Sequence, residues 1–455
     1  MNLADRLAEY AHGLSYEDLD AQVVSEAKKR VVDALGCAMG AFDENPVRIS
    51  RDVASSISHD GTSTLLGTDK KTSPDLATFV NGLMIRYFDF NDTYLSKEPA
   101  HPSDNIGATL SVAESVGAGG KDLILSTVLA YEIQCRLCDS ANIRRRGWDH
   151  VCYGLVSSAL AAGKLMNLGR SELTQAVNIA LNAHIAMRQV RAGELSMWKG
   201  ASFCNAARNA VFSALLAKRG MKGPSPIFEG EMGFFKQVSG PFKLDVEDFG
   251  GRGGSFKLNE TCVKYWPVEY HAQTAVWAAL ELKKRVSDPR KIKSVLVETH
   301  EAGYAILAKD REKWRPSTKE TADHSLPYIV GMALLEGRVD NSTYSDKNLR
   351  DPKILNFVGK IRVKENRKLT TMYPARGIPN RVTVELSAGG FESLEVEVPR
   401  GHPANPMTEE EIESKFYRLT GRRLGKEGAS RTLGRLWELE RIEDVGELVR
   451  LCQIK

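Results

Sequence analysis

Apolar side chains recur at intervals of three and four residues along most of the first half of the chain. The segments 25–39, 123–138 and 156–166 show this spacing, with short glycine-containing turns between such segments. The spacing places apolar groups on one face of an α-helix. Alanine and other small residues are frequent in several of these stretches, which favours close contact between helices. The pattern up to about residue 222 therefore predicts a helical core of several layers.

The pattern changes after about Tyr270, where stretches that combine alternating apolar and polar residues with β-branched side chains first appear. Such alternation predicts strands, and Gly389-Gly390 predicts a hairpin turn before the last of them. The predicted elements are a helix over 271–285 and strands over 293–300, 361–364, 381–386 and 391–398. Helical spacing returns at Glu409 and continues to the end of the chain.

These elements predict a mainly α fold with two domains. A large all-helical domain is built from both ends of the chain, and a smaller α+β lid domain is inserted between them. We predict residues 1–268 for the first helical part, 269–405 for the lid and 406–455 for the C-terminal helices that return to the helical domain. A chain of 455 residues is also longer than one hydrophobic core usually organises.

Composition and charge exclude several classes of protein. Apolar residues make up 42% and charged residues 26%, as in ordinary globular proteins. The net charge of +4 is spread along the chain, so we expect no nucleic-acid partner. No apolar stretch reaches the roughly 18 residues of a membrane helix, and the first residues lack the pattern of a signal peptide. From the absence of such a stretch we expect no membrane association. Seven cysteines, an odd number, favour a reducing compartment, so we expect a cytoplasmic protein.

The densest cluster of polar side chains lies in the segment 86–105, just before a predicted helix. It contains a carboxylate at Asp89, hydroxyls at Thr93 and Ser103, and an imidazole at His101. Backbone N–H groups at the start of a helix favour a bound carboxylate, so this segment is a candidate site. If the stretch from Arg86 to Thr93 ends a helix, Asp89 and Thr93 share one face of it, and Ser103 or Asp104 can cap the next helix. The alternative is a capped helix–loop–helix with ordinary turn residues. The residues alone leave both interpretations open.

Three further polar residues lie at helix starts or near the predicted domain junction. His150 follows Asp149, a candidate N-cap, and a first-turn histidine has its charged form disfavoured by the helix dipole. It is therefore either a neutral base or a solvent-facing residue. Lys199 opens a small-residue helix that otherwise has a buried character, where an ammonium must be paired or functional. Lys264 lies near the junction, a common place for pockets, although each lysine alone is compatible with a surface position.

The sequence gives little support to a metal or nucleotide cofactor. Cys135 and Cys138 form a single C-x-x-C pair inside a predicted helix, without the second pair of a structural zinc site. The thiols are not grouped as an iron–sulfur cluster requires. The glycine-rich stretch 251–254 is not followed by an apolar helix, so it does not predict a phosphate loop. We therefore expect neither a metal nor an organic cofactor.

Taken in order, the polar segments resemble the MmgE/PrpD family, which includes 2-methylcitrate dehydratases and cis-aconitate decarboxylases. The matching stretches are Asp89-Phe-Asn-Asp-Thr93, His101-Pro-Ser-Asp-Asn105, Trp148-Asp-His150, Lys199 with Gly-Ala-Ser-Phe, Gly223-Pro, Phe228-Glu-Gly230, Pro267-Val-Glu-Tyr-His-Ala-Gln-Thr-Ala-Val276, Glu320-Thr-Ala-Asp-His-Ser-Leu-Pro327 and Asn405-Pro-Met. They extend over nearly the whole chain. The resemblance implies a helical domain with an α+β lid, a homodimer formed through the helical domain, and no cofactor.

The resemblance also implies an activity, the elimination of water from a hydroxy-tricarboxylate such as 2-methylcitrate. The family's active-site positions fall on Asp89, Thr93, His101, His150, Lys199 and Lys264, with Ser103 and His324 as further substrate-binding candidates. On this basis the two lysines hold substrate carboxylates and the developing charge. His150 or His101 removes the proton, Asp89 with the other histidine protonates the departing hydroxyl, and Thr93 orients the substrate.

The resemblance leaves other reactions of the family open. Trp-Asp-His and Pro-x-Glu-Tyr-His resemble the dehydratase branch, whereas decarboxylases carry Phe-His-Pro-Thr-Gly at the first place and a histidine where Glu269 stands. The stretch from Tyr94 to Ala100 departs from both patterns. The alternatives are a cis-aconitate decarboxylase, a proton transfer of the iminodisuccinate epimerase kind, and a catalytically silent tricarboxylate-binding scaffold.

Overall fold

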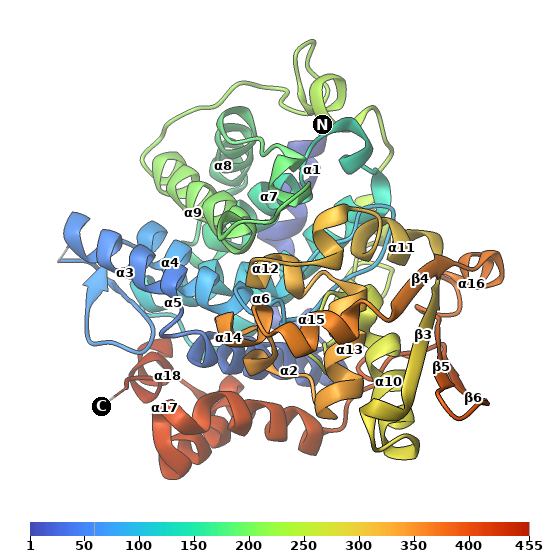
Figure 1. Cartoon of the computed structure of the whole chain (residues 1–455). Coiled ribbons are helices and arrows are strands. Elements are labelled where there is room, and N and C mark those ends of the chain that lie inside the picture. Colours follow the sequence, from blue (N-terminus) through green and yellow to red (C-terminus); the bar gives the residue numbers. More distant parts are fainter. Residues whose placement is uncertain (59, 455) are drawn as a thin grey trace.

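The computed structural model describes residues 1–58 and 60–454, and most of them are helical (Figure 1). The helices of the first part are α1 (Leu3–Gly13), α2 (Ala21–Gly40), α3 (Asn45–Ile57), α4 (Pro74–Arg86), α5 (Ile106–Val116), α6 (Gly120–Ser140), α7 (Val151–Leu165), α8 (Arg170–Ala183) and α9 (Trp198–Lys218). A two-stranded ribbon of β1 (Ser63–Thr64) and β2 (Lys71–Thr72) lies between α3 and α4. Helices α7 and α9 pack closely against each other, and the ring of Phe203 on α9 lies against Gly154 of α7, where a Cβ atom would collide with it.

The inserted part combines short helices with one sheet. Its helices are α10 (Gln273–Arg285), α11 (Glu301–Leu307), α12 (Lys319–Ala322), α13 (Leu326–Glu336), α14 (Asp346–Leu349), α15 (Pro352–Val358) and α16 (Arg367–Met372). Its strands are β3 (Ile292–Thr299), β4 (Ile361–Glu365), β5 (Asn380–Leu386) and β6 (Phe391–Val396). The strand order is β4-β3-β5-β6, with β3 parallel to β4 and antiparallel to β5, and β5 and β6 form the predicted hairpin.

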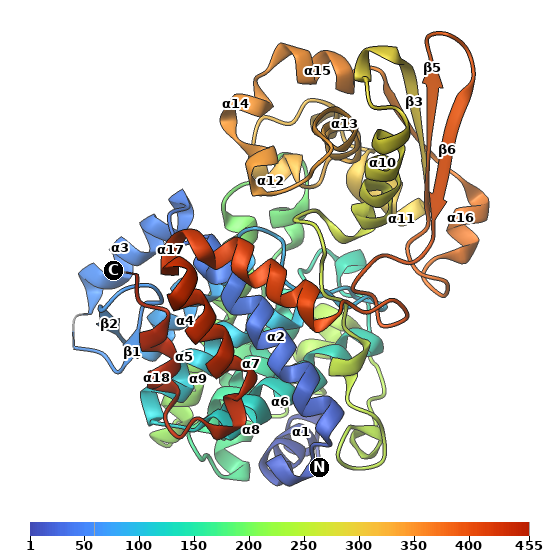
Figure 2. The same ribbon diagram turned by 90° about the horizontal axis from the view of Figure 1, so that it is seen from below.

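Alternation along the strands decides which face of this sheet is covered. Val295 and Val297 of β3 and Val382 and Val384 of β5 are buried, whereas the residues between them are more exposed. Helices α10 and α13 pack on this apolar face (Figure 2), so the second core lies between helices and sheet. The outer edge strand β6 carries charged residues, which is typical of an exposed edge.

The two ends of the chain share one hydrophobic core. Helix α17 (Glu409–Trp437), kinked at Gly425, lies along α2 in Figure 2, and α18 (Val445–Leu451) packs on α5. Buried residues from 3 to 263 and from 407 to 452 form this core, and residues 268–384 form the other. The predicted fold class, mainly α with an inserted α+β part, is confirmed. Among the described residues, no helix combines the length and apolar character that crossing a membrane requires.

Two local predictions are wrong near the polar segment. Helix α4 ends at Arg86, so Asp89 and Thr93 do not share a helix face. Ser103 and Asp104 do not cap α5, because residues 102–105 form a tight turn of their own ahead of it and their side chains bond elsewhere. The side chains of Ser103 and Asp104 bond to Asp92 and Asn91 instead of to the backbone N–H groups at the start of α5.

Candidate active site

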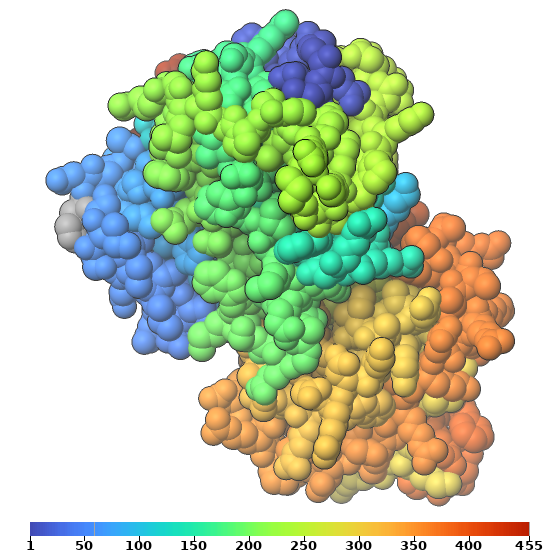
Figure 3. All heavy atoms as spheres, turned by 90° about the horizontal axis from the view of Figure 1, so that it is seen from above, coloured from blue at the N-terminus to red at the C-terminus, as the bar shows by residue number. Residues whose placement is uncertain are grey.

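A cavity of about 160 Å³ lies between the helical part and the inserted part. Figure 3 shows the two parts meeting along a seam, where the backbone of Leu195 is bonded to the side chains of Thr318 and Thr321. The cavity is lined by Arg86, Asp89, Thr93, Leu95, Pro99, His101, Arg144, His150, Arg188, Arg191, Leu195, Lys199, Lys264, Glu269, Tyr270, His271, Ala305, Ile306, Asp310, Lys313 and His324. Of the residues predicted from the sequence, Ser103 alone is absent from this lining.

The cavity is strongly basic. Among the described residues that line it, seven are lysines or arginines and three are carboxylates. The cations are Arg86, Arg144, Arg188, Arg191, Lys199, Lys264 and Lys313. A concave site with one dominant sign of charge concentrates small ligands of the opposite sign. Guanidinium groups pair with carboxylates through two parallel hydrogen bonds. The cavity is therefore suited to a small molecule with several carboxylates.

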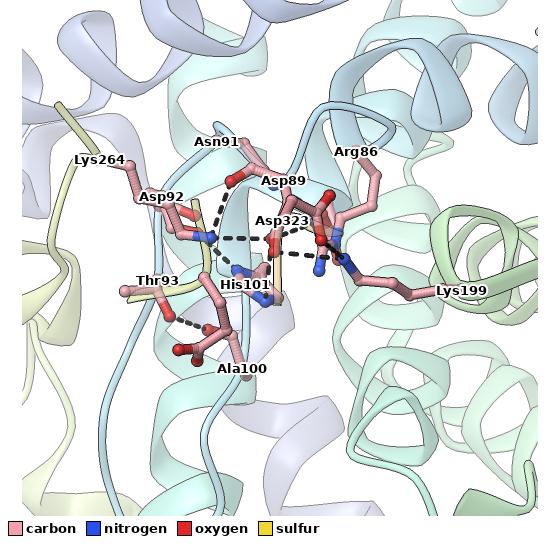
Figure 4. Close-up of polar contacts among 12 residues, drawn as sticks. Arg86, Asp89, Asn91, Asp92, Thr93, Ala100, His101, Lys199, Lys264 and Asp323 are labelled. Carbon is pink, nitrogen blue, oxygen red and sulfur yellow. Dashed lines mark hydrogen bonds and ion pairs between the residues drawn. The ribbon is translucent and has the colours of Figure 1, made fainter. Parts of the chain in front are cut away.

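Asp89 lies at the centre of this charge network. Its backbone is left-handed, with a φ of +50°, a conformation that costs energy for any residue but glycine. Its Oδ1 accepts hydrogen bonds from Arg86 at 2.6 Å and from Lys264 at 2.8 Å, and its Oδ2 lies 3.4 Å from Nζ of Lys199. Figure 4 shows the two lysines approaching this carboxylate from opposite sides. Lys264 also donates to the backbone oxygen of Asp89 at 2.9 Å and so supports the strained turn.

A short antiparallel bridge explains why Lys264 reaches Asp89 from a distant part of the sequence. The backbone groups of Thr93 and Cys262 exchange two hydrogen bonds of 2.8 Å. This pairing holds the segment after Asp89 beside the segment that contains Lys264. The loop that follows Thr93 closes on itself through a second bridge between Tyr94 and Ala100.

Asp89 is held as an anion. Burial alone would raise its pKa, but Arg86, Lys199 and Lys264 outweigh burial and hold the pKa well below the usual range of a carboxyl group. An ionised carboxylate has no proton to give. This charge state does not favour the predicted role of Asp89 as a proton donor, and its carboxylate instead contacts the ammonium groups of Lys199 and Lys264.

Lys199 joins Asp89 to a second carboxylate from the inserted part. Its Nζ lies 3.1 Å from Oδ1 of Asp323 and 3.2 Å from Nδ1 of His324. Asp89, Asp323 and His324 are grouped closely enough to hold a metal ion. The ammonium of Lys199 contacts all three of these side chains, so a lysine already supplies the positive charge at this place.

His101 presents an unprotonated nitrogen to the cavity. Its Nδ1 lies 2.8 Å from the backbone oxygen of Asp92, and because a carbonyl only accepts, Nδ1 carries the hydrogen. Nε2 is then an acceptor, 3.9 Å from Oδ1 of Asp89. Burial, assisted by Arg86 and Lys264, holds the pKa of His101 well below its usual range. His101 is therefore a neutral imidazole with a free lone pair.

His150 is differently placed, directly before α7 rather than in its first turn. Its Nε2 lies 3.0 Å from Nη2 of Arg191, which can only donate, so the lone pair of His150 is occupied. Arg191 is in turn paired with Asp149 at 2.8 Å. Burial lowers the pKa of His150 to about 3, with Asp149 opposing this shift and Arg191 adding to it. Both histidines are neutral. Nδ1 of His150 has no hydrogen-bond partner, but it carries the hydrogen, so of the two rings only that of His101 has an unoccupied lone pair.

The two predicted hydroxyl ligands have different positions. The hydroxyl of Thr93 donates to the backbone oxygen of Ala100 at 3.1 Å and lines the cavity (Figure 4). Ser103 is buried behind the cavity wall. Its hydroxyl donates to Asp92 at 2.6 Å and accepts from Asn91 at 2.8 Å. Ser103 therefore braces the loop, and the structure does not bring it to the substrate space.

A fourth histidine of the cavity, His271, is part of a bonded cluster on the side of the inserted part. Nδ1 of His271 is 2.7 Å from Oε1 of Glu269, and its Nε2 is 3.1 Å from the hydroxyl of Tyr373, whose ring stacks on His300 at 4.2 Å. Burial opposes ionisation, but His271 outweighs it and lowers the pKa of Glu269 to about 2. Both nitrogens of His271 are engaged, so this cluster is a fixed support rather than a free base.

Sequence reasoning missed several functional side chains. It passed over Arg86, which binds Asp89, and Asp323, which binds Lys199. It also missed Arg191 and Arg188, which lie between α8 and α9 in a stretch without regular apolar spacing. Two signals were available: Asp323 directly precedes His324 in a motif already singled out, and Arg188 and Arg191 recur at three-residue spacing before Lys199.

Comparison with known proteins identifies the family. A model described as the MmgE/PrpD N-terminal domain matches residues 5–247, and one described as the MmgE/PrpD C-terminal domain matches residues 266–439. The chain belongs to the MmgE/PrpD family. The resemblance predicted from the motifs is confirmed, and this MmgE/PrpD chain is an enzyme of the lyase class.

Relatives with assigned names cover most of this MmgE/PrpD chain. A 2-methylcitrate dehydratase from Cupriavidus necator is 32% identical over 85% of the chain and 83% of its own length. A 2-methylcitrate dehydratase from Escherichia coli (strain K12) is 32% identical over 86% and 84%. A fungal alkylcitrate dehydratase is 28% identical over 90% and 86%. These matches extend across both sides of the cavity.

Proposed function

We propose that this MmgE/PrpD enzyme eliminates water from a hydroxy-tricarboxylate such as 2-methylcitrate, giving 2-methylaconitate, with no metal or organic cofactor. The observation that carries the proposal is the neutral imidazole of His101, whose free Nε2 faces a cavity lined by seven cations. Relatives named 2-methylcitrate dehydratase that align with most of the chain support the choice of substrate.

In this proposal His101 removes the proton on the carbon next to a substrate carboxylate. Such a proton is weakly acidic, so the enzyme must stabilise the extra negative charge that develops on that carboxylate. Lys199 and Lys264 supply this stabilisation from opposite sides of Asp89. Burial, and after it the cations Arg86 and Lys264, hold down the pKa of His101. A bound tricarboxylate offsets these cations and raises that pKa, so that the base gains strength when substrate is present.

Lys264 is the proposed proton donor to the departing hydroxyl. Burial lowers the pKa of Lys264, with Arg86 adding to the shift and Asp89 opposing it, which makes its ammonium a better acid. The carbon–hydrogen and carbon–oxygen bonds break, a carbon–carbon double bond forms, and the hydroxide leaves as water with the proton of Lys264. Oδ1 of Asp89 lies near both His101 and Lys264, where its negative charge favours the protonated form of each. After product release, proton exchange with water returns His101 to its neutral form and Lys264 to its ammonium form.

The alkyl group of the substrate is assigned to an apolar corner of the cavity. Leu95 and Pro99, from the loop closed by Tyr94 and Ala100, line the cavity together with Ile306 of α11. Citrate differs from 2-methylcitrate by a single methyl group, and an apolar surface is the part of the cavity that can recognise it. The loop that departs from the common family patterns thus supplies part of this corner.

The direct test is turnover by the purified protein after treatment with a chelator. We expect 2-methylcitrate to yield a conjugated unsaturated acid, followed by ultraviolet absorbance and confirmed by mass spectrometry. The His101→Gln variant serves as the negative control. Loss of activity on chelation, with recovery on adding metal, would contradict the cofactor-free mechanism.

Two further arms separate the alternatives. Release of carbon dioxide from cis-aconitate, with no product from 2-methylcitrate, would replace the proposal with decarboxylation. Thermal stabilisation by tricarboxylates without any turnover would favour a binding scaffold. Dehydration of 2-methylcitrate without carbon dioxide release from cis-aconitate is the outcome that we expect.

A further inference from the structure

A buried lysine from the far end of the chain lies directly behind the active site. Lys415 is on α17, and its side chain is 1% exposed. Its Nζ donates to the backbone oxygen of Phe90 at 2.7 Å and to that of Lys264 at 2.9 Å. It also pairs with Asp33 of α2 at 2.6 Å and lies 3.7 Å from the ring centre of Phe90. A buried ammonium persists only when it is satisfied in this way.

The two carbonyls that Lys415 binds belong to the segments that form the catalytic centre. Phe90 follows Asp89, whose left-handed backbone is strained. Lys264 is the residue whose ammonium binds Asp89. The N–H of Asp89 is bonded to the oxygen of Arg86 at 3.0 Å, and its own oxygen accepts from Lys264 at 2.9 Å. Lys415 therefore binds the backbone oxygen of the residue after Asp89 and, with the same ammonium group, holds it beside the backbone oxygen of Lys264.

We propose that Lys415 is a positioning residue, which fixes the backbone of Phe90 and of Lys264 so that Asp89 and the Lys264 ammonium meet in the geometry needed for turnover. The return of α17 to the helical domain then has a catalytic consequence beyond packing. A shift of about 1 Å in a reacting group is enough to slow an enzyme by roughly a hundredfold, so a lost anchor should lower kcat. Lys415 does not line the cavity, so it does not bind substrate itself.

A purely structural role must be separated from this one. Removing one partner of a buried ion pair destabilises a protein, whereas replacing both partners with apolar residues is often neutral. We therefore compare Lys415→Met with the double variant Lys415→Met/Asp33→Leu. The single variant should lose both thermal stability and activity. The double variant should regain most of the stability but keep a kcat at least tenfold below that of the parent protein, with KM changed less than threefold.

The matched control is Thr420→Val. Thr420 is also buried on α17, and its hydroxyl bonds to the oxygen of Phe416 within the same helix, away from the cavity. This variant should keep the kcat of the parent protein at any temperature where it is folded. Lys415→Arg is a second probe if the double variant does not fold, because a planar guanidinium cannot satisfy the same acceptors as an ammonium. It should also lower kcat tenfold.

The expected loss of kcat rests on the proposed dehydration, so a second measurement is independent of substrate. Hydrogen exchange of the backbone over 87–94, followed by mass spectrometry, should be faster in the double variant and unchanged in Thr420→Val. Faster exchange in a protein that never turns over a tricarboxylate would refute the proposed function and keep the positioning role. A double variant, or a folded Lys415→Arg, with unchanged kcat and unchanged exchange would overturn the positioning role.

Discussion

The two walls of the cavity are built in different ways. On the helical side, Asp89 is nearly inaccessible and is bound by Arg86 and Lys264, with Lys415 behind them. On the side of the inserted part, the short helix α11 contributes an exposed Ala305 and a half-buried Ile306. Charged groups that must meet reacting atoms need fixed geometry, whereas a surface that recognises a methyl group needs only shape. The contrast assigns the chemistry to the helical wall, whereas the inserted part contributes, through Ile306, to the discrimination between substrates.

The largest expected effect is on the helical wall. We expect His101→Gln to lower kcat about a thousandfold, because general base catalysis contributes roughly 10²–10⁴. His150→Gln should lower it by no more than about tenfold, since the lone pair of His150 is already bonded to Arg191. Steady-state kinetics with 2-methylcitrate checks both variants. Equal losses in the two variants would show that the choice of base is wrong.

A second prediction compares one lysine from each wall. Lys264→Met should lower kcat about a hundredfold, because it removes a cation that stabilises the developing charge and the proposed proton donor. Lys313→Met removes a cation of the inserted part that lines the cavity without contacting Asp89. It should raise KM and leave kcat within a few fold. If Lys264→Met and Lys313→Met changed kcat and KM in the same proportion, the proposed difference between the two walls would be wrong.

A third prediction concerns the apolar corner. Ile306→Ala removes apolar surface that we assign to the alkyl group, so the preference for 2-methylcitrate over citrate should fall about tenfold in kcat/KM. Competition between the two substrates in one reaction measures this ratio directly. Leu195→Ala, which alters an apolar lining residue of the helical side, is the matched control and should leave the ratio unchanged. If only Leu195→Ala changed the preference for 2-methylcitrate over citrate, the alkyl group would bind near Leu195 rather than near Ile306.

The last prediction concerns stability rather than turnover and involves one histidine from each wall. Burial lowers the pKa of His150 to about 3 and, together with Lys199, that of His324 to about 4. A histidine with a depressed pKa stabilises the fold above its unfolded pKa of about 6.5 and loses that contribution as pH falls. We expect each of these two histidines to lower the free energy of unfolding by on the order of 2 kcal/mol when the pH falls from 7 to 5. Urea unfolding at pH 7 and at pH 5 measures how much the free energy of unfolding changes with pH. This change should be smaller in His150→Gln and in His324→Gln than in the parent protein, and an unaltered change would contradict the lowered pKa values.

Much of the fold could be predicted from periodicity. The helices and the hairpin of β5 and β6 formed where spacing and glycine pairs placed them, because burial of one face decides both. Of the candidate residues, seven of eight line one cavity, and Ser103 is the exception. Local capping rules failed at Ser103 because Asp92 and Asn91, which the loop brings close, are stronger partners for its hydroxyl than an exposed helix end.

The sequence by itself determined the family, the mainly α fold and most of the polar groups of the site, because these depend on residue types and their spacing. The tertiary structure decided which of these groups meet and what charge surrounds each of them. Whether Asp89 is an acid or an anion depends on nearby Arg86 and also on two lysines more than a hundred residues away. Whether His101 or His150 has a free lone pair depends on single partner atoms. Electrostatic energies fall with distance in space rather than along the chain, so only the folded arrangement fixes them.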